Sequence, residues 1–348
     1  MNATQSGARR EIWELPARVG IIDVGSNTVR LVAYDAENRL PQLIYNEKAF
    51  CGLGRILATT NRLDPDSVKM ALTTIQRFVT LARQMGVAYL DMVATAAVRD
   101  AENGKEFVDQ VHKLTGHRLK VVTGEDEARY SALGVMAGIN DVDGVAADLG
   151  GGSLELVGVK SGKTDMGASL PLGTLRLMDA HADSRSNASK EIDKQLDKLD
   201  WLKTHKGRNF YAVGGTWRAL ARLHMASRDY PLRILHHYEM EGGEAQNFAR
   251  DISKFTSETE LYVTGVSRKR VATLPIAALV LYRLLQRLQP EKLIVSALGL
   301  REGILFDHAA EHIQKMDPLI EFCRDLARRR SRFPAHGEEL MRWIDPVF

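Results

Sequence analysis

Apolar and polar positions along the chain form a pattern that predicts strands and amphipathic helices in alternation. Three consecutive strands are expected from about residue 19, followed by a helix over residues 64–86. Asp64 or Asp66 can cap the start of this helix, and Pro65 suits its first turn. The elements predicted next are a buried strand over 88–99, a helix over 103–117 ended by Gly116, a strand over 118–124 and a helix over 125–139. This alternation indicates an α/β fold.

A second series of strands and helices follows the polar break at residues 140–144. It opens with two short apolar runs on either side of three glycines and closes with EKLIVSALGLREGILFD at 291–307. Residues 181–190 are polar and are expected to form a loop that leads into a helix. The 348 residues are enough for two domains and a substantial core.

The three glycines lie in AADLGGGSLELVG, residues 146–158. Consecutive glycines are costly to order, because glycine loses more backbone freedom on folding than any other residue. They indicate either a tight turn or a ligand that approaches the backbone closely. Bare amides suit phosphate oxygens, but the stretch has neither the P-loop pattern nor the dinucleotide-binding pattern. Taken alone, it favours a plain glycine-rich hairpin.

An earlier stretch repeats the pattern of this hairpin. Residues 21–32, IIDVGSNTVRLV, and residues 146–157, AADLGGGSLELV, match without any shift at an offset of 125 residues. The matched pairs are Asp23 and Asp148, Gly25 and Gly150, Thr28 and Ser153, Leu31 and Leu156, and Val32 and Val157. The repetition indicates a duplicated domain in which each half contributes one loop to a shared phosphate-binding cleft, and it makes two unrelated hairpins the weaker interpretation.

A third glycine turn, in NFYAVGGTWRALARL, separates a strand from an amphipathic helix. Gly214, Gly215 and Thr216 would place backbone donors at a helix N-terminus, where the helix dipole favours anions. Alone, the turn is more often simple capping with Thr216 as the N-cap. Beside the two repeated loops it is a candidate third wall of the cleft.

Composition excludes several classes of protein. The chain is 45% hydrophobic and 26% charged, has no apolar run of ~18 residues, and begins without a hydrophobic leader, so no membrane association is expected. Cys51 and Cys323 lie far apart without a motif, which favours a cytoplasmic protein without disulfides. A net charge of +3 makes nucleic-acid binding an unfavoured prediction, and the arginine run at 324–332 is more often a solvated helix face than a binding site.

The ordered motifs resemble those of the exopolyphosphatase and guanosine pentaphosphate phosphohydrolase (Ppx/GppA) family, within the actin, sugar kinase and heat-shock chaperone superfamily. They are IIDVGSNTVRLV, VATAAVR, TGEDEARY, ADLGGGSLEL, SLPLGTLRL, AVGGTWRALA and SALGLREGIL. The resemblance implies two ribonuclease-H-like domains of the actin-like ATPase fold around an interdomain cleft. It also implies the short form of the family, without the helical HD-type region of longer relatives. The expected divisions are an extension at 1–18, domains at 19–125 and 126–300, and a helical segment at 301–348 that packs back near the first domain.

The resemblance implies an exopolyphosphatase that removes terminal phosphate from inorganic polyphosphate with water as acceptor. It carries the catalytic acid onto Glu127, which would act as the general base or orient the water. Asp126 stands where the family usually has glutamate, so the resemblance gives it no firm role. Without the resemblance, Glu125, Asp126 and Glu127 would be explained as acids that stabilise a helix N-terminus.

Mg²⁺, or another divalent cation, is the expected cofactor. Asp148 and Glu155 lie on the two strands of one hairpin, so both carboxylates can face the cleft and hold the ion through waters. Asp23 can play a similar part from the first loop, provided that a cation offsets its charge. The residue that matches Glu155 in the first hairpin is Arg30, so an acid there is not a general requirement of the hairpin. The alternative is an exposed Glu155 on a half-buried strand.

The resemblance places a phosphate-binding arginine at Arg99, at the end of the VATAAVR strand. By position alone, an exposed arginine at a strand end would be the simpler interpretation. A polymer would need a longer basic track, for which SRKR at 267–270 and the arginine run at 324–332 are candidates. The expected phosphate cradle consists of Gly25, Ser26, Asn27, Gly151, Gly152, Ser153, Gly215 and Thr216.

Three alternatives stay open. The first is that the substrate is guanosine pentaphosphate instead of polyphosphate. With either substrate, the chain can form a homodimer. A sugar-kinase-like phosphotransferase would need a sugar pocket and an aspartate base, for which the sequence offers no equivalent. A regulator that binds nucleotide or polyphosphate without catalysis would keep the glycine loops. The histidine pairs His236-His237 and His308/His312 lack the acids of a His-Asp metal cluster.

Overall fold

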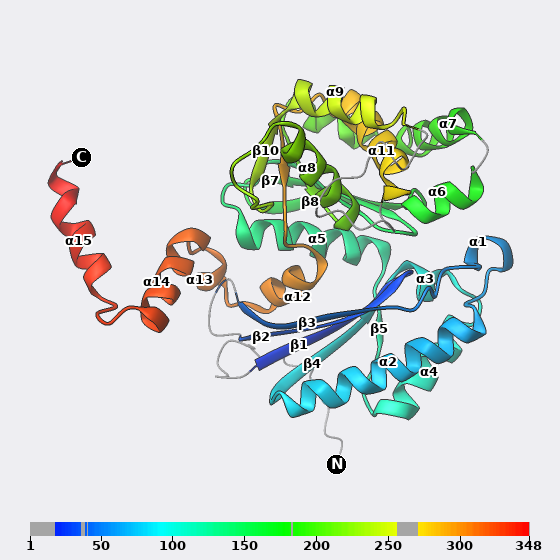
Figure 1. The fold of residues 1–348 in the computed structure, drawn as a ribbon, viewed down its shortest axis with the longest axis horizontal. Helices are drawn as coiled ribbons and strands as arrows, with labels where there is room; N and C mark the ends of the chain where they lie inside the picture. The colour runs from blue at the N-terminus through cyan, green and yellow to red at the C-terminus, as the bar shows by residue number, and fades with distance from the viewer. Residues whose placement is uncertain (1–17, 36–38, 40, 182–183, 256–270, 348) are drawn as a thin grey trace, which may run out of the picture.

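The computed structural model describes residues 18–35, 39, 41–181, 184–255 and 271–347, and the expected basic track at 267–270 and residues 1–17 of the expected extension lie outside them. Two α/β halves lie one above the other in Figure 1, and a helical arm leaves the body to one side. Each half contains one β-sheet. No helix in the described ranges combines the length and the apolar character that a membrane span requires.

The first sheet has five strands in the order β3-β2-β1-β4-β5. β1 and β2 form an antiparallel hairpin, β3 continues it antiparallel, and β4 and β5 run parallel to β1. The strands are β1 (Arg18–Val24), β2 (Thr28–Asp35), β3 (Gln42–Phe50), β4 (Val87–Ala94) and β5 (Lys120–Val121).

The second sheet repeats this arrangement and adds one strand at its edge. Its order is β10-β11-β9-β6-β7-β8, so β8-β7-β6-β9-β11 corresponds to β3-β2-β1-β4-β5. The predicted duplication and the α/β fold are therefore present in the structure. The strands are β6 (Gly144–Leu149), β7 (Leu154–Lys160), β8 (Lys163–Leu170), β9 (Asn209–Val213), β10 (Tyr238–Glu241) and β11 (Lys292–Val295).

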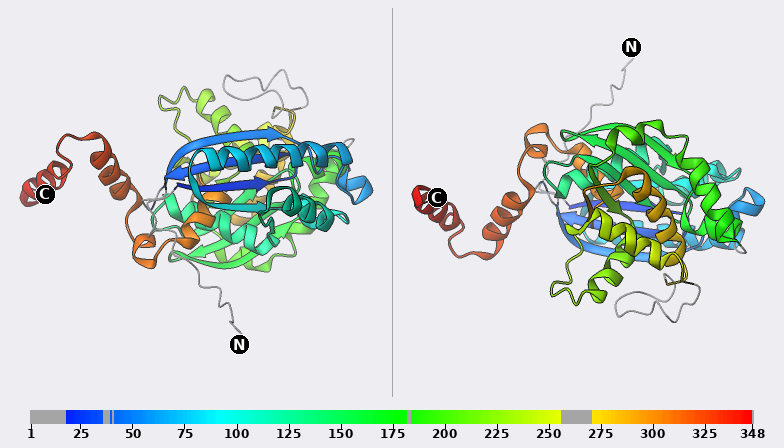
Figure 2. Two further views of the ribbon diagram at one scale, coloured as in Figure 1. Left: turned by 90° about the horizontal axis from the view of Figure 1, so that it is seen from below. Right: turned by 90° about the horizontal axis from the view of Figure 1, so that it is seen from above.

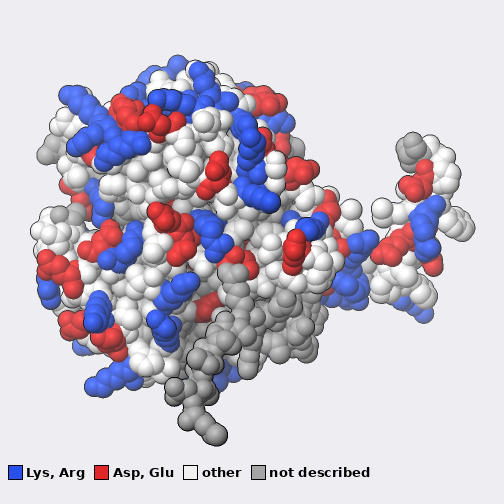
Figure 3. Space-filling model, turned by 180° about the vertical axis from the view of Figure 1, so that it is seen from behind, with Lys and Arg blue, Asp and Glu red and all other residues white. Residues whose placement is uncertain are grey.

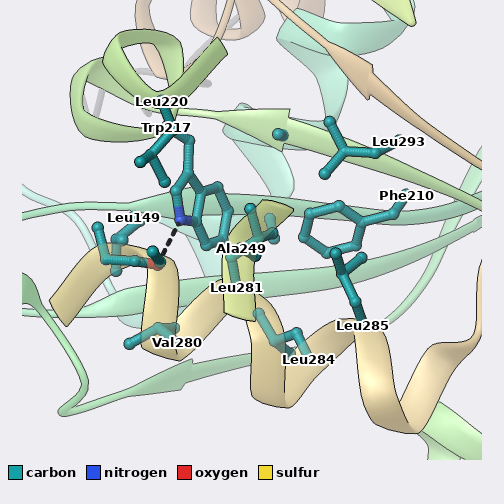
Figure 4. Close-up of a cluster of buried hydrophobic side chains, with 14 of the residues drawn as sticks. Leu149, Phe210, Trp217, Leu220, Ala249, Val280, Leu281, Leu284, Leu285 and Leu293 are labelled. Atoms are coloured by element: carbon teal, nitrogen blue, oxygen red, sulfur yellow. Dashed lines mark hydrogen bonds between the residues drawn. The ribbon is translucent and has the colours of Figure 1, made fainter. Parts of the chain in front are cut away.

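Helices cover the outer face of each sheet. α2 and α4 pack on the first sheet, and α7, α8, α9 and α11 pack on the second (Figures 1 and 2). Trp217 is central to the second core, where its ring contacts Phe210 edge to face and its Nε1 donates to the carbonyl of Ala277 at 3.2 Å (Figure 4). The helices named here are α2 (Pro65–Gln84), α4 (Gly104–Thr115), α7 (Arg185–Leu196), α8 (Gly215–Ser227), α9 (Gly242–Ile252) and α11 (Leu274–Leu288).

Two helices, α5 (Gly124–Gly138) and α12 (Leu300–His308), form the layer between the sheets. Tyr130 of α5 and Leu305 of α12 pack on the first sheet, while Val135 of α5 and Phe306 of α12 pack toward the second. One core layer therefore holds both halves, because each helix contributes apolar side chains to both sheets.

Small residues allow α5 and α12 to approach backbone to backbone. A Cβ on Gly303 would fall on the carbonyl oxygen of Tyr130, and a Cβ on Gly134 would fall on that of Gly299. Side chains at these positions would separate the two helices.

The predicted strand over residues 88–99 is wrong beyond Ala94. β4 ends there, where the amide of Thr95 donates to Val24 at 3.2 Å, and α3 (Ala96–Asp100) follows. The pattern of apolar residues did not distinguish a strand from a helix here, because alanine fits a buried strand and also has the highest helix propensity. Arg99 therefore lies on a short helix.

Two other boundaries also differ from the expectation. The strand predicted over 118–124 is only two residues long, because the chain leaves the sheet edge to begin α5. The loop predicted over 181–190 gives way to α7 at Arg185, since Ser184 caps the helix by accepting from Asn187 N at 3.3 Å. Asp64, as expected, caps α2 by accepting from Ser67 N at 3.0 Å, and Gly116 ends α4 with a φ of 74°.

The domain divisions at residues 125 and 300 remain predictions. Beyond α12, residues 311–347 form the arm seen in Figures 1 and 2. The remaining helices are α1 (Leu57–Thr60), α6 (Thr174–Ala180), η2 (Asp200–His205), α13 (Glu311–Gln314), α14 (Pro318–Arg330), α15 (His336–Ile344) and η4 (Asp345–Val347).

Replacing Gly303 by alanine should destabilise the whole chain by ~3 kcal/mol or more, because the added methyl group forces α12 away from α5. Chemical denaturation monitored by circular dichroism measures the effect. Gly243→Ala in α9 is the matched control, since a Cβ there meets nothing within 4 Å. Equal stabilities for the two variants would contradict this account of the interhelical contact.

Candidate active site

A cleft of about 290 Å³ lies between the two halves. Its walls come from the β1–β2 loop, the β6–β7 loop, the turn between β9 and α8, and the first turns of α5 and α12. Twelve of the thirteen residues predicted for the site line it. They are Asp23, Gly25, Ser26, Asn27, Glu127, Asp148, Gly151, Gly152, Ser153, Glu155, Gly215 and Thr216.

The two hairpins that face the cleft share one hydrogen-bond pattern. Asp23 pairs with Arg30 in the register of the first hairpin, and Asp148 pairs with Glu155 in that of the second. Each turn closes with the same backbone bond, from Gly25 N to Thr28 O at 2.9 Å and from Gly150 N to Ser153 O at 3.0 Å. The repeated sequence pattern therefore corresponds to two structurally equivalent loops.

In the first loop, neighbouring amides occupy the backbone carbonyls. Ser26 O accepts from Gly54 N at 2.8 Å, and Asn27 O accepts from the amides of Cys51 and Gly52 at 3.1 Å. Turning the carbonyls toward the protein leaves the positive ends of the peptide dipoles on the cleft side. Such an arrangement of amides suits an anion.

The second loop is held in the same way by the N-terminus of α6. Thr174 N donates to Gly150 O at 3.1 Å, and Leu175 N donates to Gly151 O at 2.9 Å. Within the described part of the chain, the amides of Gly151 and Gly152 have no hydrogen-bond acceptor. A Cβ on Gly152 would lie 3.0 Å from the Ser26 Oγ, so the two loops meet in the cleft.

The third turn lies beside the acid of the second hairpin. Gly214 precedes α8 with a φ of 101°, and a Cβ on it would lie 2.8 Å from the Asp148 Oδ1. Glycine is therefore required by both the backbone conformation and the space. α8 begins at Gly215, so Thr216 lies in its first turn and is not the N-cap. The positive end of α8 therefore lies at the cleft.

Three carboxylates gather where these walls meet. Glu155 is only 2% exposed, which excludes the alternative of a surface residue, and its Oε1 accepts from Ser169 Oγ at 2.8 Å. Asp148 Oδ2 accepts from Ser131 Oγ at 3.0 Å. Glu127 is the third, at the start of α5.

Burial changes the acidity of all three groups. It raises the pKa of Glu155 to about 7 and is also the main cause of the raised pKa of Asp148. Burial and the nearby Glu155 raise the pKa of Glu127 well above its ordinary value, although Arg99 opposes the shift. A group of acids with raised pKa values in a cleft is typical of sites that bind cations or transfer protons.

Arg99 is the one predicted residue that lies outside the main cleft, in an adjoining hollow that shares Ser153 with it. Its Nη1 donates to the Glu127 Oε2 at 3.1 Å and to Val122 O at 3.3 Å. The candidate base and the candidate phosphate ligand therefore form an ion pair.

The sequence prediction missed two partly buried arginines in the cleft. The Arg301 Nη1 pairs with the Asp23 Oδ2 at 2.8 Å, so Asp23 has a cation beside it from within the protein. The Nε of Arg301 is buried without a partner among the described residues. Arg218 donates to Ala297 O at 2.8 Å, and burial lowers the pKa of its guanidinium to about 10.

A signal for both arginines was present in the sequence. Arg218 follows the Gly-Gly-Thr turn by two residues, and Arg301 follows Gly299 in SALGLREGIL. In each case the N-cap of the helix is a glycine, Gly214 for α8 and Gly299 for α12, and the arginine lies in the first turn that follows, at the cleft.

The donors fit a hard divalent cation held partly by its substrate. No three His, Cys, Asp or Glu side chains within the described ranges are arranged as a metal cage. Mg²⁺ commonly uses one or two carboxylates together with waters and phosphate oxygens, and Asp148 and Glu155 offer such a pair. The histidine pairs lie elsewhere, since His236 contacts Gly138 O at 3.1 Å and His308 lies beside Asp91.

Known proteins share this sequence pattern and fold. The family model described as the Ppx/GppA phosphatase family matches residues 31–312. Exopolyphosphatase 1 of Mycobacterium tuberculosis is 30% identical over 300 residues, which cover 83% of this chain and 87% of that protein. The crystal structure of the Aquifex aeolicus member of the Ppx/GppA family is 27% identical, with a TM-score of 0.71 over 84% of this chain and 97% of that one. The structure of a Cytophaga hutchinsonii exopolyphosphatase has the same fold, with a TM-score of 0.74 at 24% identity over 84% of this chain and 99% of that one. The chain therefore belongs to the Ppx/GppA phosphatase family and is a phosphoanhydride hydrolase, as its ordered motifs predicted.

Proposed function

We propose that the chain is an exopolyphosphatase that removes the terminal phosphate of inorganic polyphosphate, with Glu127 as the general base. The observation that supports this most directly is that glycine loops from both halves, whose amides suit an anion, line one cleft together with the Glu127 carboxylate. The name of the mycobacterial relative, Exopolyphosphatase 1, agrees with this choice of substrate.

The glycine loops would hold the terminal phosphates of the polymer. Their amides are fixed before substrate arrives, because neighbouring amides already occupy the loop carbonyls. Fixed donors stabilise a developing negative charge without having to reorganise during the reaction. Arg301 and Arg218 add positive charge along the same wall.

Glu127 would accept a proton from the attacking water. The oxygen of that water forms the new bond to the terminal phosphorus, the bridging P–O bond breaks, and the shortened polyphosphate leaves with the bridging oxygen. Arg99 now pairs with Glu127, and a phosphoryl oxygen can take over that cation when substrate binds. Losing the arginine would make the carboxylate a stronger base, because the ion pair opposes its raised pKa.

We place Mg²⁺ or a similar divalent cation at Asp148 and Glu155, where it would neutralise phosphate charge during bond cleavage. Ser131 and Ser169 would orient these carboxylates through the hydrogen bonds described above.

Guanosine pentaphosphate is the second candidate substrate. Phe50 lines the cleft, is 47% exposed, and has the Lys48 Nζ 4.6 Å from its ring centre. An exposed aromatic ring beside a phosphate site can stack a nucleobase. The amide cradle would hold the phosphates of either substrate in the same way.

Glu127→Gln should lower the rate of phosphate release from long-chain polyphosphate at least ~100-fold, because the amide cannot accept the proton of water. Release is measured with Mg²⁺ on polyphosphate and on guanosine pentaphosphate. Asp126→Asn is the matched control, since it removes the neighbouring acid at the same helix start, and its rate should stay within about twofold of the parent rate. Full activity in Glu127→Gln would refute the assignment. A faster parent rate on guanosine pentaphosphate would identify that nucleotide as the preferred substrate.

Glu155→Gln should stabilise the metal-free protein at about pH 8 but not at about pH 5. The folded-state pKa of Glu155 is raised to about 7 from 4.5, so the unfolded chain ionises first and the folded state is progressively destabilised between these values. The glutamine removes this penalty, which amounts to about 3 kcal/mol when complete. Denaturant midpoints in a chelator measure the effect at both pH values.

Glu302→Gln provides a control that should change the stability in the opposite direction at about pH 8. Although burial would raise it, the folded-state pKa of Glu302 is lowered by Arg301 and by the hydrogen bond from Tyr34. Its ionised form therefore stabilises the fold above the unfolded pKa, and the variant should be less stable than the parent at about pH 8, with a smaller loss toward acid pH. The same sign for both variants would contradict this account of the buried charges.

A further inference from the structure

A second hollow, of about 660 Å³, adjoins the cleft, and the proposed mechanism gives it no function. Its lining comes from α3 and the start of α5 on one side, and from the end of β8 and the start of α6 on the other. Ser153 lines both the hollow and the cleft. The two cavities therefore meet at the second glycine loop.

The partition between the two cavities contains side chains that are hydrogen-bonded directly to one another. Glu127 and Glu155 lie on the cleft side, and Arg99 and Ser169 lie on the hollow side. The Arg99 Nη1 donates to the Glu127 Oε2 at 3.1 Å, and the Ser169 Oγ donates to the Glu155 Oε1 at 2.8 Å. At these two points, side-chain hydrogen bonds separate the hollow from the cleft.

The geometry of the proposed hydrolysis determines where the orthophosphate product lies. In an in-line displacement, the attacking water and the leaving polymer occupy opposite sides of the transferred phosphorus. Because Glu127 takes the proton of that water, the new orthophosphate lies beside Glu127, and the shortened polymer lies on the side away from it. While the polymer stays bound, it obstructs the way back through the mouth of the cleft, whereas the partition lies next to the product.

The charge at the partition changes in the same step. Before the reaction, Arg99 is paired with the Glu127 carboxylate. Once Glu127 has taken up the proton, its carboxyl group is neutral and no longer offsets the positive charge of Arg99. Arg99 keeps one acidic neighbour, since its Nε lies 3.3 Å from the Asp100 Oδ1. The partition therefore attracts an anion more strongly at the moment when the orthophosphate forms.

Arg176 supplies a second guanidinium group on the hollow side. It lies on α6 in the second half, and its Nη2 is 3.1 Å from the Asp100 Oδ2. Asp100 thus bridges Arg99 and Arg176 and holds the two half-buried cations close together. Guanidinium groups in such a position suit phosphate oxygens. Glu125 also lines the hollow, but it is exposed, so water and salt screen its charge.

The outer surface is mixed in sign. Figure 3 shows basic and acidic side chains interspersed over the described residues of one face of the molecule. The net charge of the chain is only +3. A surface of this kind favours neither sign strongly, so a phosphate ion is selected by a local pair of cations such as Arg99 and Arg176.

We infer that the hollow is the exit route and a transient binding site for the orthophosphate product. Arg99 draws the ion through the partition and Arg176 receives it, while the shortened polymer stays in the cleft. The inference rests on the proposed function, because it takes the position of the product from the role of Glu127.

Comparing the phosphate formed with the phosphate released tests this route. Quenching the first turnover with denaturant counts all orthophosphate formed, and a fluorescent phosphate sensor in solution counts only the released ion. Arg176→Ala should leave the rate of formation within about twofold of the parent rate but slow release at least ~10-fold, because a charge-assisted contact with the ion is lost. Arg176→Lys should restore part of the release rate, since it keeps the charge. Arg208→Ala is the matched control: Arg208 is also 30% exposed, it pairs with Asp143 at 2.7 Å outside the hollow, and its loss should change neither rate.

Asp100→Asn distinguishes phosphate binding from the loss of an ion pair between the halves. It removes the same ion pair as Arg176→Ala but keeps both guanidinium groups, so release should be at least as fast as in the parent. Equal slowing of release in Asp100→Asn and Arg176→Ala would overturn the inference, as would release by Arg176→Ala at the parent rate. The rate of formation reports hydrolysis itself, so a failure of the proposed function appears there, in Glu127→Gln, and not in the delay of release.

Added orthophosphate provides a second measurement. If the hollow holds phosphate while the cleft holds polymer, orthophosphate should inhibit the parent non-competitively with respect to long-chain polyphosphate, because additional polymer cannot displace it. Arg176→Ala should require at least ~10-fold more orthophosphate for this inhibition. Purely competitive inhibition of the parent would indicate that phosphate leaves through the mouth of the cleft and would overturn the inference.

Discussion

The contact between α5 and α12 is the constraint on which the rest of the structure depends. Both helices lie between the sheets, and their backbones touch at Gly134 and Gly303. Each helix begins at the cleft, so the contact also determines where Glu127 and Arg301 lie. Neither half alone provides all the residues that line the cleft, because Glu127 comes from the shared layer and the glycine loops come from both halves. The packing of the two helices and the geometry of the cleft therefore depend on the same pair of glycines.

The charges of the cleft are balanced only in part within the protein. Arg301 pairs with Asp23 and Arg99 pairs with Glu127, but burial still leaves Glu127, Asp148 and Glu155 with raised pKa values. In the proposed mechanism, a divalent cation would favour the ionised forms of Asp148 and Glu155 and would also be bound by substrate phosphate. The substrate and the cation would then each strengthen the binding of the other. Burying Asp148 and Glu155 destabilises the folded protein locally, and proteins retain such local instability at functional sites.

Much of the site was predictable because it is encoded in local sequence. The match of Asp23 to Asp148 at a constant offset predicted two equivalent hairpins, since a glycine loop between two strands has few possible conformations. The ordered motifs then supplied the roles. Arg99 was correctly placed beside the site but on the wrong element, because alanine-rich stretches fit a strand or a helix equally well. Arg301 lies in the SALGLREGIL motif, which could have indicated it, but its pairing with Asp23, 278 positions away, is not visible in any local pattern.

The C-terminal arm shows a second limit of prediction from the sequence. The sequence predicted a helical segment at 301–348 with a solvated, arginine-rich face, but the pattern alone cannot tell which face of such a helix turns inward. The pairing of Arg329 with Asp35, together with the low exposure of Glu321 and Asp325, shows that the charged face of α14 lies on the body. The arginine run was a candidate substrate track. The structure explains it better as part of the contact between α14 and the body and of the exposed surface of that helix. A basic cluster acquires a function from what lies opposite it, and here the opposing groups are carboxylates of the protein itself.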